Sequence, residues 1–367
     1  MKRLALLIVV LMLLFTAGCS YFAPSAPADT QPVDITDMNE GPVLTETADN
    51  EEASPVPTEA PTEAPTQEPT QEPTPTPYVT TLYKVRCNEL NVRREPDLEG
   101  EVIGTLHYED RVEVIGRANE KFTYVLYEGE VCCLYSYYIV PADEKLYGYV
   151  YPMYEYKKDD DGNIVLEDGK PVMLTAELID IRLVIPGIEV YQIFGTEENF
   201  TGNVLYTRSV PVLQTATAKK LKKAFNIFKQ DGYTIKIYDC YRPKSVQFIL
   251  YDIVKNSSYI ANPYKSASNH NRAAAVDMTL IGPDGVELDF PTPMHTFNSL
   301  ANRGSRREWT EEQRKNVEYM TEVMVSCGFK TINSEWWHFS DNDYLSFMVL
   351  DIDMVNIPMY TASQLGY

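Results

Sequence analysis

A change in composition near residue 77 limits where this chain of 367 residues can build a folded core. Residues 20–77 contain no Lys or Arg, twelve Asp or Glu, and twelve of the 24 prolines. A tract with so few apolar side chains cannot bury enough surface to offset the entropy lost on folding. We therefore expect residues 20–77 to form a disordered, acidic, Pro/Thr-rich linker, with the folded part of the chain after it.

The same tract explains much of the acidity of the chain. The formal net charge is −21, and the twelve acidic residues of 20–77 contribute −12 of it because no basic residue offsets them. The remaining acidity is too diffuse to indicate a cationic partner. Binding to nucleic acid requires a basic patch or stripe, so the charge balance argues against a nucleic-acid partner.

The first nineteen residues predict export. Lys2 and Arg3 precede an apolar run, Leu4–Phe15, which is shorter than the roughly 20 residues that a transmembrane helix needs. Small residues then lead to Cys19. This order resembles a bacterial lipoprotein signal (residues 1–19), although Thr16 replaces the usual Leu. The resemblance implies an extracytoplasmic protein, anchored to the cell membrane as a lipoprotein through Cys19. The alternative is an ordinary secretory signal with an incidental cysteine.

The other five cysteines show no CxxC pair and no paired spacing; they are Cys87, Cys132, Cys133, Cys240 and Cys327. This pattern excludes a disulfide scaffold and a cysteine zinc knuckle. A bridge from Cys87 to Cys132 or Cys133 remains open. Cys240 and Cys327 have apolar neighbours, and we expect both to be small core residues.

Residues 78–142 predict a small all-β unit, because short runs of β-branched and aromatic residues alternate with turn-forming residues. These runs are Tyr83–Arg86, Leu90–Arg93, Glu101–Ile103, Arg111–Ile115 and Phe122–Leu126. The segment Leu90-Asn-Val-Arg-Arg-Glu-Pro96 and the runs after it resemble a bacterial SH3-like domain. The resemblance implies a small barrel that binds the cell wall. A folded spacer without a ligand is the alternative.

Residues 147–367 predict a larger α+β unit. Apolar faces predict one helix over 215–230 and another that begins at Pro243. The capping box Thr310-Glu-Glu-Gln313 predicts the start of a third helix, which ends at Gly328. Strand-like runs on either side of an Asp- and Gly-containing turn predict a hairpin over 151–166. Two further strands are expected at Ala274–Ile281 and Trp336–Ser340.

Four short motifs in the last third of the chain contain the residues of a metal site. They are Tyr238-Asp-Cys-Tyr-Arg-Pro243, Ser268-Asn-His270, Ala273-Ala-Ala-Val-Asp277 and Glu335-Trp-Trp-His338. Two histidines and a carboxylate are the ligand set of an open catalytic zinc. A glutamate off the metal suits a general base. The chain has four histidines, and two of them lie inside these motifs.

The local sequence imposes two conditions on this site. Asp277 lies among Val276, Met278 and Leu280, where a buried carboxylate is costly unless a metal ion or a hydrogen bond holds it. Glu335 and His338 differ in parity, so on a regular strand they would point to opposite faces. We therefore expect a bend or bulge that turns both residues toward one site.

The motifs together resemble those of the D-alanyl-D-alanine metallopeptidases over about residues 185–345. Ser268-x-His270-x-x-Ala273-x-Ala275-x-Asp277 is similar to the family's SxHxxGxAxD pattern, and Glu335-Trp-Trp-His338 to its ExWH pattern. Two further features resemble motifs of the dipeptidase branch. One is the Tyr238–Pro243 segment, and the other is Asn199-Phe-Thr-Gly202 with Leu205-Tyr206. The fold class we expect is therefore an α+β zinc peptidase domain, residues 147–367, preceded by a small all-β SH3-like barrel.

The resemblance implies a role for each matching residue. His270, Asp277 and His338 would bind one Zn²⁺ per chain, and Glu335 would act as the general base. Arg242 would stabilise the developing oxyanion, or alternatively form only a salt bridge at the start of a helix.

Ser268 would contact the substrate, with a plain turn residue as its alternative. The chain also departs from the family. Ala273 replaces a glycine, and Tyr191–Thr196 replaces an acidic-x-Arg-Tyr-Ala-Thr run. His295 replaces an aspartate that helps to hold the free amine of the substrate.

These features predict a zinc-dependent hydrolase of D-Ala-D-Ala or related peptidoglycan peptides at the cell wall. The change at His295 leaves the predicted zinc ligands in place but replaces the carboxylate that would hold the amine of free D-Ala-D-Ala with an imidazole. Two alternatives stay open. One is a D,D-carboxypeptidase or endopeptidase that trims stem peptides of the wall, and the other is a non-catalytic wall-binding lipoprotein.

Overall fold

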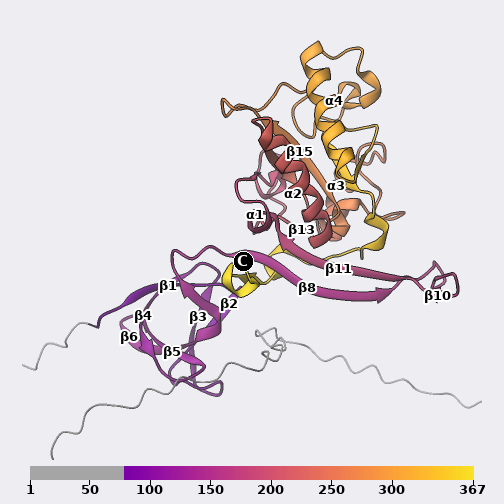
Figure 1. Ribbon diagram of the computed structural model, residues 1–367. Helices are drawn as coiled ribbons and strands as arrows, with labels where there is room; N and C mark the ends of the chain where they lie inside the picture. The colour runs from indigo at the N-terminus through magenta and orange to yellow at the C-terminus, as the bar shows by residue number, and fades with distance from the viewer. Residues whose placement is uncertain (1–77) are drawn as a thin grey trace, which may run out of the picture. The chain divides into compact units, whose positions relative to one another are not determined.

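The computed structural model describes residues 78–367 (Figure 1). The predicted lipoprotein signal, Cys19 and the linker over 20–77 lie outside the described residues. Residues Thr80–Tyr367 form one compact unit, which contains an all-β region followed by a mixed α and β region. Within the described part of the chain, no helix has both the length and the apolarity to cross a membrane.

The all-β region is a seven-stranded antiparallel sheet with the strand order β3-β2-β6-β5-β4-β1-β7. Its strands are β1 (Thr81–Val85), β2 (Glu89–Arg93), β3 (Val102–His107), β4 (Arg111–Arg117), β5 (Phe122–Tyr127), β6 (Glu130–Tyr135) and β7 (Ile139–Pro141). Each of the first five strands overlaps one of the predicted runs. The pairings run in a line from β3 to β7 without joining these two strands, so they do not confirm the predicted barrel.

The core of this sheet comes from alternating side chains. In β2, Leu90 and Val92 are buried while Asn91 between them is exposed, which is the period of two expected for a strand with one covered face. Val85, Val125 and Leu134 complete the centre of the cluster. Within residues 78–367 no disulfide joins Cys87 to Cys132 or Cys133.

The mixed region contains two larger sheets and a two-stranded one. The four-stranded sheet has the order β13-β11-β8-β18, and the five-stranded sheet has the order β12-β14-β15-β17-β16. The first comprises β8 (Tyr147–Tyr156), β11 (Met173–Asp180), β13 (Val212–Gln214) and β18 (Met359–Tyr360). The second comprises β12 (Glu189–Val190), β14 (Thr234–Asp239), β15 (Ala275–Ile281), β16 (Phe329–Thr331) and β17 (His338–Asp341).

Four α-helices accompany these sheets: α1 (Ile181–Val184), α2 (Thr215–Gln230), α3 (Lys244–Val254) and α4 (Glu311–Ser326). The three predicted helices are confirmed. Thr310 caps α4, because its hydroxyl accepts a hydrogen bond from Gln313 N while the Gln313 side-chain oxygen accepts one from Thr310 N. The short 3-10 helices are η1 (Ser136–Tyr138), η2 (Ile193–Gly195), η3 (Asn269–Arg272), η4 (Ser299–Ala301), η5 (Arg303–Ser305), η6 (Tyr344–Ser346), η7 (Met354–Asn356) and η8 (Ser363–Leu365).

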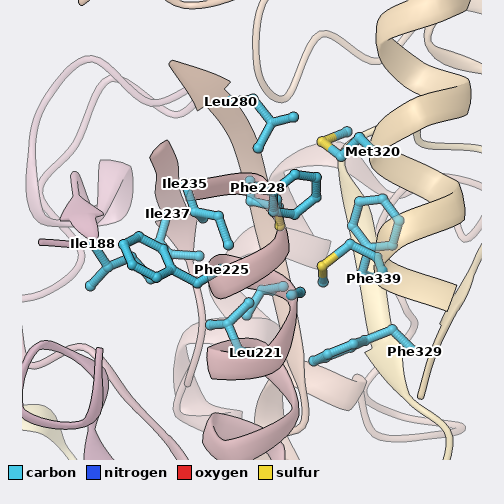
Figure 2. Close-up of a cluster of buried hydrophobic side chains, with 14 of the residues drawn as sticks. Ile188, Leu221, Phe225, Phe228, Ile235, Ile237, Leu280, Met320, Phe329 and Phe339 are labelled. Carbon is cyan, nitrogen blue, oxygen red and sulfur yellow. The ribbon is translucent and has the colours of Figure 1, made fainter. Parts of the chain in front are cut away.

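The main core lies between the five-stranded sheet, α2 and α4 (Figure 2). Leu221, Phe225 and Phe228 extend from one face of α2 toward Ile235 and Ile237 of β14. The opposite side is closed by side chains of α4, β16 and β17, namely Met320, Phe329 and Phe339. This core fixes β15 and β17, the two strands that carry residues of the predicted metal site.

Two sequence predictions need correction. The turn at Asp159–Asn163 forms, but Ile164–Leu166 is not the return strand of the hairpin: Ile164 makes only an isolated bridge with Lys158. Instead, β8 pairs with β11, and a small β9 (Leu166–Glu167) and β10 (Lys170–Pro171) hairpin lies between them. The predicted strand Trp336–Ser340 begins two residues later, at His338, because residues 336 and 337 form a bend.

Two arginines tie the all-β region to the C-terminal part of the chain. Arg86, which follows β1, donates hydrogen bonds to Tyr137 O at 2.7 Å and to Met359 O at 2.6 Å. Arg208 donates to Asn88 Oδ1 at 3.1 Å and to the carbonyls of Met354 and Ile357 at 3.0 Å.

Candidate metal centre

The three predicted ligands come from two paired strands and one short helix. Asp277 lies near the start of β15, and His338 is the first residue of β17, directly opposite Asp277 in the antiparallel register. His270 lies in η3, and Ala273, the residue directly after this helix, is in the left-handed region with φ of 52°. Such a conformation favours glycine, which explains the glycine of the family pattern, and Ala273 adopts it here.

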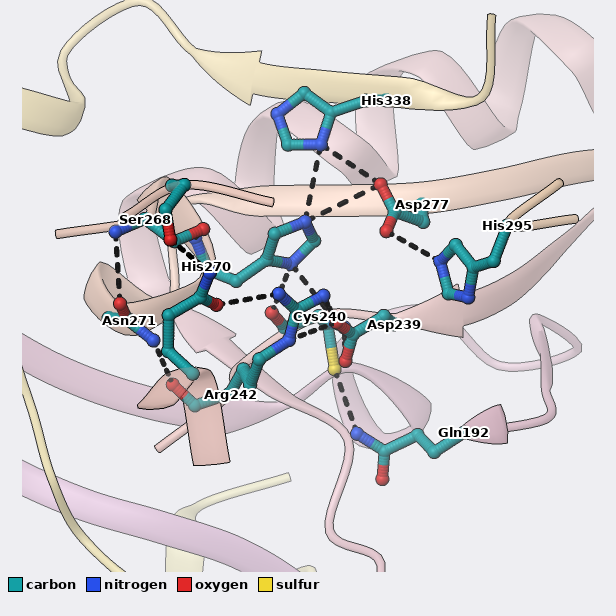
Figure 3. Close-up of polar contacts among 12 residues, drawn as sticks. Gln192, Asp239, Cys240, Arg242, Ser268, His270, Asn271, Asp277, His295 and His338 are labelled. Atoms are coloured by element: carbon teal, nitrogen blue, oxygen red, sulfur yellow. Dashed lines mark hydrogen bonds and ion pairs between the residues drawn. The ribbon is translucent and has the colours of Figure 1, made fainter. Parts of the chain in front are cut away.

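One potential ligand atom from each of the three residues lies within 4.8 Å of the others (Figure 3). Asp277 Oδ1 is 2.9 Å from His338 Nδ1 and 3.4 Å from His270 Nε2. The two ring nitrogens are 3.2 Å apart. All three side chains are buried. Two imidazoles and one carboxylate that converge in this way fit the donor set of an open zinc site.

Hydrogen bonds behind the rings prepare both histidines to bind a metal ion. His270 Nδ1 lies 2.7 Å from the carbonyl of Cys240, which can only accept, so Nδ1 carries the hydrogen and Nε2 has a free lone pair. His338 Nε2 lies 2.8 Å from Ser340 Oγ. Without a metal ion, Nδ1 donates to the Asp277 carboxylate at 2.9 Å. When the hydrogen moves to Nε2, which Ser340 Oγ can accept, Nδ1 presents its lone pair to a cation. Partners of this kind fix the tautomer of metal-binding histidines.

The electrostatics of the cluster favour a cation at its centre. Burial alone would raise the pKa of Asp277, but contacts with His270, His295 and His338 hold it well below the ordinary value. Burial alone would lower the pKa of His270, and the Asp277 and Asp239 carboxylates outweigh it, so that this pKa is raised. Asp277 is therefore ionised across the physiological range and attracts positive charge, either protons or a metal ion.

Glu335 lies beside the cluster without entering it. Its side chain is buried, and Oε2 is 4.0 Å from His338 Nδ1. Residues 333–334 and 336–337 form bends, which turn Glu335 and His338 to the same side despite their difference in parity. Burial is the main reason why the pKa of Glu335 rises to about 7 in the metal-free protein. A carboxyl group with such a pKa exchanges protons near neutral pH.

Arg242 is the fixed positive group of the site. It is buried, donates from Nε to Asp239 Oδ2 at 3.0 Å and from Nη1 to Gln247 Oε1 at 2.7 Å, and pairs with Asp239 through Nη2 as well. Burial alone would lower the pKa of Arg242, but Asp239 raises it above the ordinary value. The helix-start salt bridge is therefore present, and Arg242 also lines the central cavity.

Ser268 and His295 have structural contacts within the site. Ser268 Oγ accepts from His270 N and caps η3, which matches the turn alternative, and the residue also lines the cavity. His295 Nε2 donates to Asp277 Oδ2 at 3.0 Å, and its ring stacks on Phe194. The His295 Nδ1 atom is buried and lacks a hydrogen-bond partner among residues 78–367. The predicted substrate contacts of both residues stay predictions.

A cavity of about 180 Å³ opens onto the cluster. It joins the ligands, Glu335 and Arg242 to an aromatic and apolar wall made of Phe194, Phe200, Tyr259, Ile260 and Phe297. Asp277 and Glu335 are the only carboxylates among the residues that line it. The arrangement therefore offers a cation site, a proton acceptor and a buried guanidinium around one small space.

Several residues of the site were not predicted. Asp239 holds Arg242, Gln247 supports the same guanidinium, and Ser340 contacts His338. Asp239 lies within a recognised motif, so the Asp-x-x-Arg spacing is a signal that could have identified it. Gln247 and Ser340 carry no such local signal.

Both regions of the chain are similar to known protein families. A family model described as D-ala-D-ala dipeptidase matches residues 174–357, and a bacterial SH3 domain model matches residues 88–152. The D-alanyl-D-alanine dipeptidase of Escherichia coli (strain K12) is 28% identical over 176 residues, which cover 48% of this chain and 90% of the relative. That of Enterococcus faecium is 27% identical over 181 residues, with 42% and 90% covered.

Among solved structures, a zinc complex of the vancomycin-resistance D,D-pentapeptidase VanY matches with a TM-score of 0.24 and 14% identity. The match covers 44% of this chain and 88% of that structure.

Proposed function

The chain belongs to the D-Ala-D-Ala dipeptidase family of metallopeptidases, and we propose from this premise that it hydrolyses D-Ala-D-Ala or related peptidoglycan peptides with one zinc ion. The observation that carries the proposal is the convergence of His270, Asp277 and His338 beside Glu335 and Arg242. His270 Nε2, one Asp277 oxygen and His338 Nδ1 would hold the ion. When bound, zinc supplies Lewis-acid chemistry that polarises a carbonyl and acidifies water.

The proposed roles of the protein side chains follow from their positions. The Glu335 carboxylate takes a proton from the attacking water and delivers it to the nitrogen of the departing amine as the peptide bond breaks. Arg242 uses some of its N–H groups to contact Asp239 and Gln247. Its remaining N–H groups donate to the carbonyl oxygen of the substrate, where negative charge develops. The aromatic wall excludes water and accepts the apolar part of the substrate.

We further propose that the enzyme works at the cell wall. The bacterial SH3 domain match supports attachment to the wall through the all-β region. The signal-like sequence before Cys19 supports a lipid anchor in the cell membrane, and the linker over 20–77 would separate the enzyme from that surface. These two segments lie outside the described residues, so the support for the anchor comes from the sequence.

One observation favours a second candidate, a D,D-carboxypeptidase or endopeptidase that acts on longer wall peptides. A free dipeptide presents an ammonium group, which is costly to bury without a carboxylate partner. In this cavity, Asp277 is the proposed metal ligand and Glu335 the proposed base, so neither carboxylate is available to pair with an ammonium group. His295 stands in place of the family's aspartate and donates to Asp277. A peptide with a blocked amine avoids this cost.

The test is amine release by purified, zinc-loaded protein of residues 78–367. The substrates are D-Ala-D-Ala, N-acetyl-D-Ala-D-Ala and a stem pentapeptide ending in D-Ala-D-Ala. Cleavage of the free dipeptide alone supports the dipeptidase, and cleavage of the blocked peptides supports the second candidate. Bound zinc without cleavage of any of the three would contradict the proposed activity and favour a wall-binding role.

A further inference from the structure

The bend that presents Glu335 leaves two backbone carbonyls without strand partners. The pairing of β15 with β17 extends backwards as far as a hydrogen bond from Met278 N to Trp337 O, at 3.2 Å. The carbonyls of Glu335 and Trp336 lie before this point, outside the ladder. Buried carbonyls of this kind need other donors, and their donor determines how firmly the bend is held.

Arg303 supplies these donors. Its Nε donates to Glu335 O at 3.2 Å, and its Nη2 donates to Trp336 O. Nη1 donates to Thr321 Oγ1 of α4 at 2.6 Å, so the guanidinium connects the bend to a helix of the core. Its backbone adds a further contact, from Arg303 N to Asn333 O at 2.8 Å. The planar guanidinium suits this task because it presents several donors in a fixed geometry.

No acidic side chain in the described part of the chain balances the charge of the Arg303 guanidinium. Within residues 78–367, no carboxylate lies within ion-pair distance of the guanidinium. The central carbon of the guanidinium, Cζ, lies over the ring of Phe339, 5.2 Å from the ring centroid. Burial lowers the pKa of Arg303 to about 10. Arg303 is partly buried, and a cation that loses part of its hydration without gaining a counter-ion lowers stability. The carbonyls of the bend are its principal acceptors.

We infer that Arg303 is a positioning residue for Glu335: it fixes the bend and thereby holds the carboxylate at the distance required for proton transfer. This inference rests on the proposed function, in which Glu335 is the base. Arg303 touches neither the cavity nor the three ligands. His338 is held by its own strand pairing with β15, so Arg303 acts on the base and leaves metal binding unchanged.

The experiment is a double-mutant cycle on the zinc-loaded full chain, using the most rapidly cleaved of the three peptides above. Arg303→Met keeps the apolar stem and removes the donors, and we expect kcat to fall about 100-fold, the effect of a small misplacement of a catalytic group. KM and zinc affinity should change by less than about threefold. In a Glu335→Gln background, the same substitution should reduce kcat by less than about threefold, because the misplaced group is already inactive.

Two further variants keep the test decisive. Arg303→Lys retains the charge but loses the planar set of donors, and it should recover only part of kcat. If Arg303→Met does not fold, Arg303→Lys takes its place in the cycle. Arg306→Met in the same loop is the matched control, since Arg306 is exposed and forms a surface ion pair with Glu318 at 3.5 Å; it should leave kcat unchanged.

The outcomes separate the two claims. An equal loss from Arg303→Met in both backgrounds, an unchanged kcat or a loss of zinc would overturn the role of Arg303 and leave the base assignment intact. Full activity in Glu335→Gln alone would instead overturn the proposed base.

Discussion

His270 and His338 are prepared for metal binding by contacts that face away from the cavity. The carbonyl of Cys240 and the hydroxyl of Ser340 each engage one ring nitrogen and leave the other directed at Asp277. On the far side, His295 holds the second Asp277 oxygen at 3.0 Å. Each donor of the cluster is thus oriented before any ion arrives, which reduces the entropy lost on binding.

The Ser340 contact gives a direct test of this preparation. Ser340→Ala removes the partner of His338 Nε2, and we expect zinc affinity to weaken about 10-fold, within the range seen for such supporting contacts. The measurement is competition for zinc with a coloured chelator. Ser258→Ala, at an exposed position, serves as control. Unchanged affinity in Ser340→Ala would show that the strand alone orients the ring.

The shifted pKa values predict how the metal-free protein responds to pH. His270 and Glu335 both have raised pKa values when folded, so the stability that their protonated forms provide is lost as pH rises through those values. The low pKa of Asp277 affects stability only in acid.

With a chelator present, the melting temperature should therefore decrease as the pH rises from about 5 to about 8. Added zinc should raise the melting temperature by more at the higher pH values, because its ligands have then lost their protons. Calorimetry at several pH values, with and without zinc, measures both trends. A melting temperature that rises with pH without metal would contradict this account.

At the residue scale, the sequence identified the groups that carry the chemistry and missed those that support them. His270, Asp277, Glu335 and His338 stand in short motifs with recognisable spacing, and the structure brings all four together. Arg303 acts on backbone carbonyls more than 30 positions away in the chain, and no local pattern records such a contact.

At the scale of elements, the register of β15 and β17 places two ligands side by side, and errors in the predicted strands have physical causes. Trp336 and Trp337 have high strand propensity, which predicted a strand that starts too early. In the structure, Trp336 stacks on Phe290 and donates to Thr292 instead of joining the ladder. The helices were predictable because each combines an apolar face with end signals, as Thr310 does for α4.

A partly buried ion pair ties α2 to the strand that carries His338. Lys220 Nζ lies 2.5 Å from Asp341 Oδ1, and Asp341 is fully buried at the end of β17. Lys220→Met leaves this carboxylate without its cation, and we expect a loss of about 3 kcal/mol in the free energy of unfolding. Thr217, which donates to Asp341 at 2.7 Å, limits the loss. Urea titration measures it, with the exposed Lys219→Met as control; equal midpoints for the two variants would contradict this role.

At the scale of the whole molecule, the all-β region and the peptidase region share buried contacts. Val140 of β7 belongs to the same buried cluster as Val210 and Met359, and Arg86 donates to the Met359 carbonyl. The sequence predicted two successive domains but gave no sign of these contacts, because they join segments far apart in the chain, 273 residues in the case of Arg86 and Met359. Long-range pairing of this kind has no local pattern.

The central claim is that a zinc site and the Glu335 base together hydrolyse a peptide, and Glu335→Gln tests it most directly. The measurement is zinc content and amine release for this variant and for the unaltered protein, with the same peptides. The account predicts that Glu335→Gln retains its zinc, because Glu335 is not a ligand, and loses turnover by about 10²–10⁴-fold, the contribution of a general base. Near-native turnover in the zinc-loaded variant would contradict it.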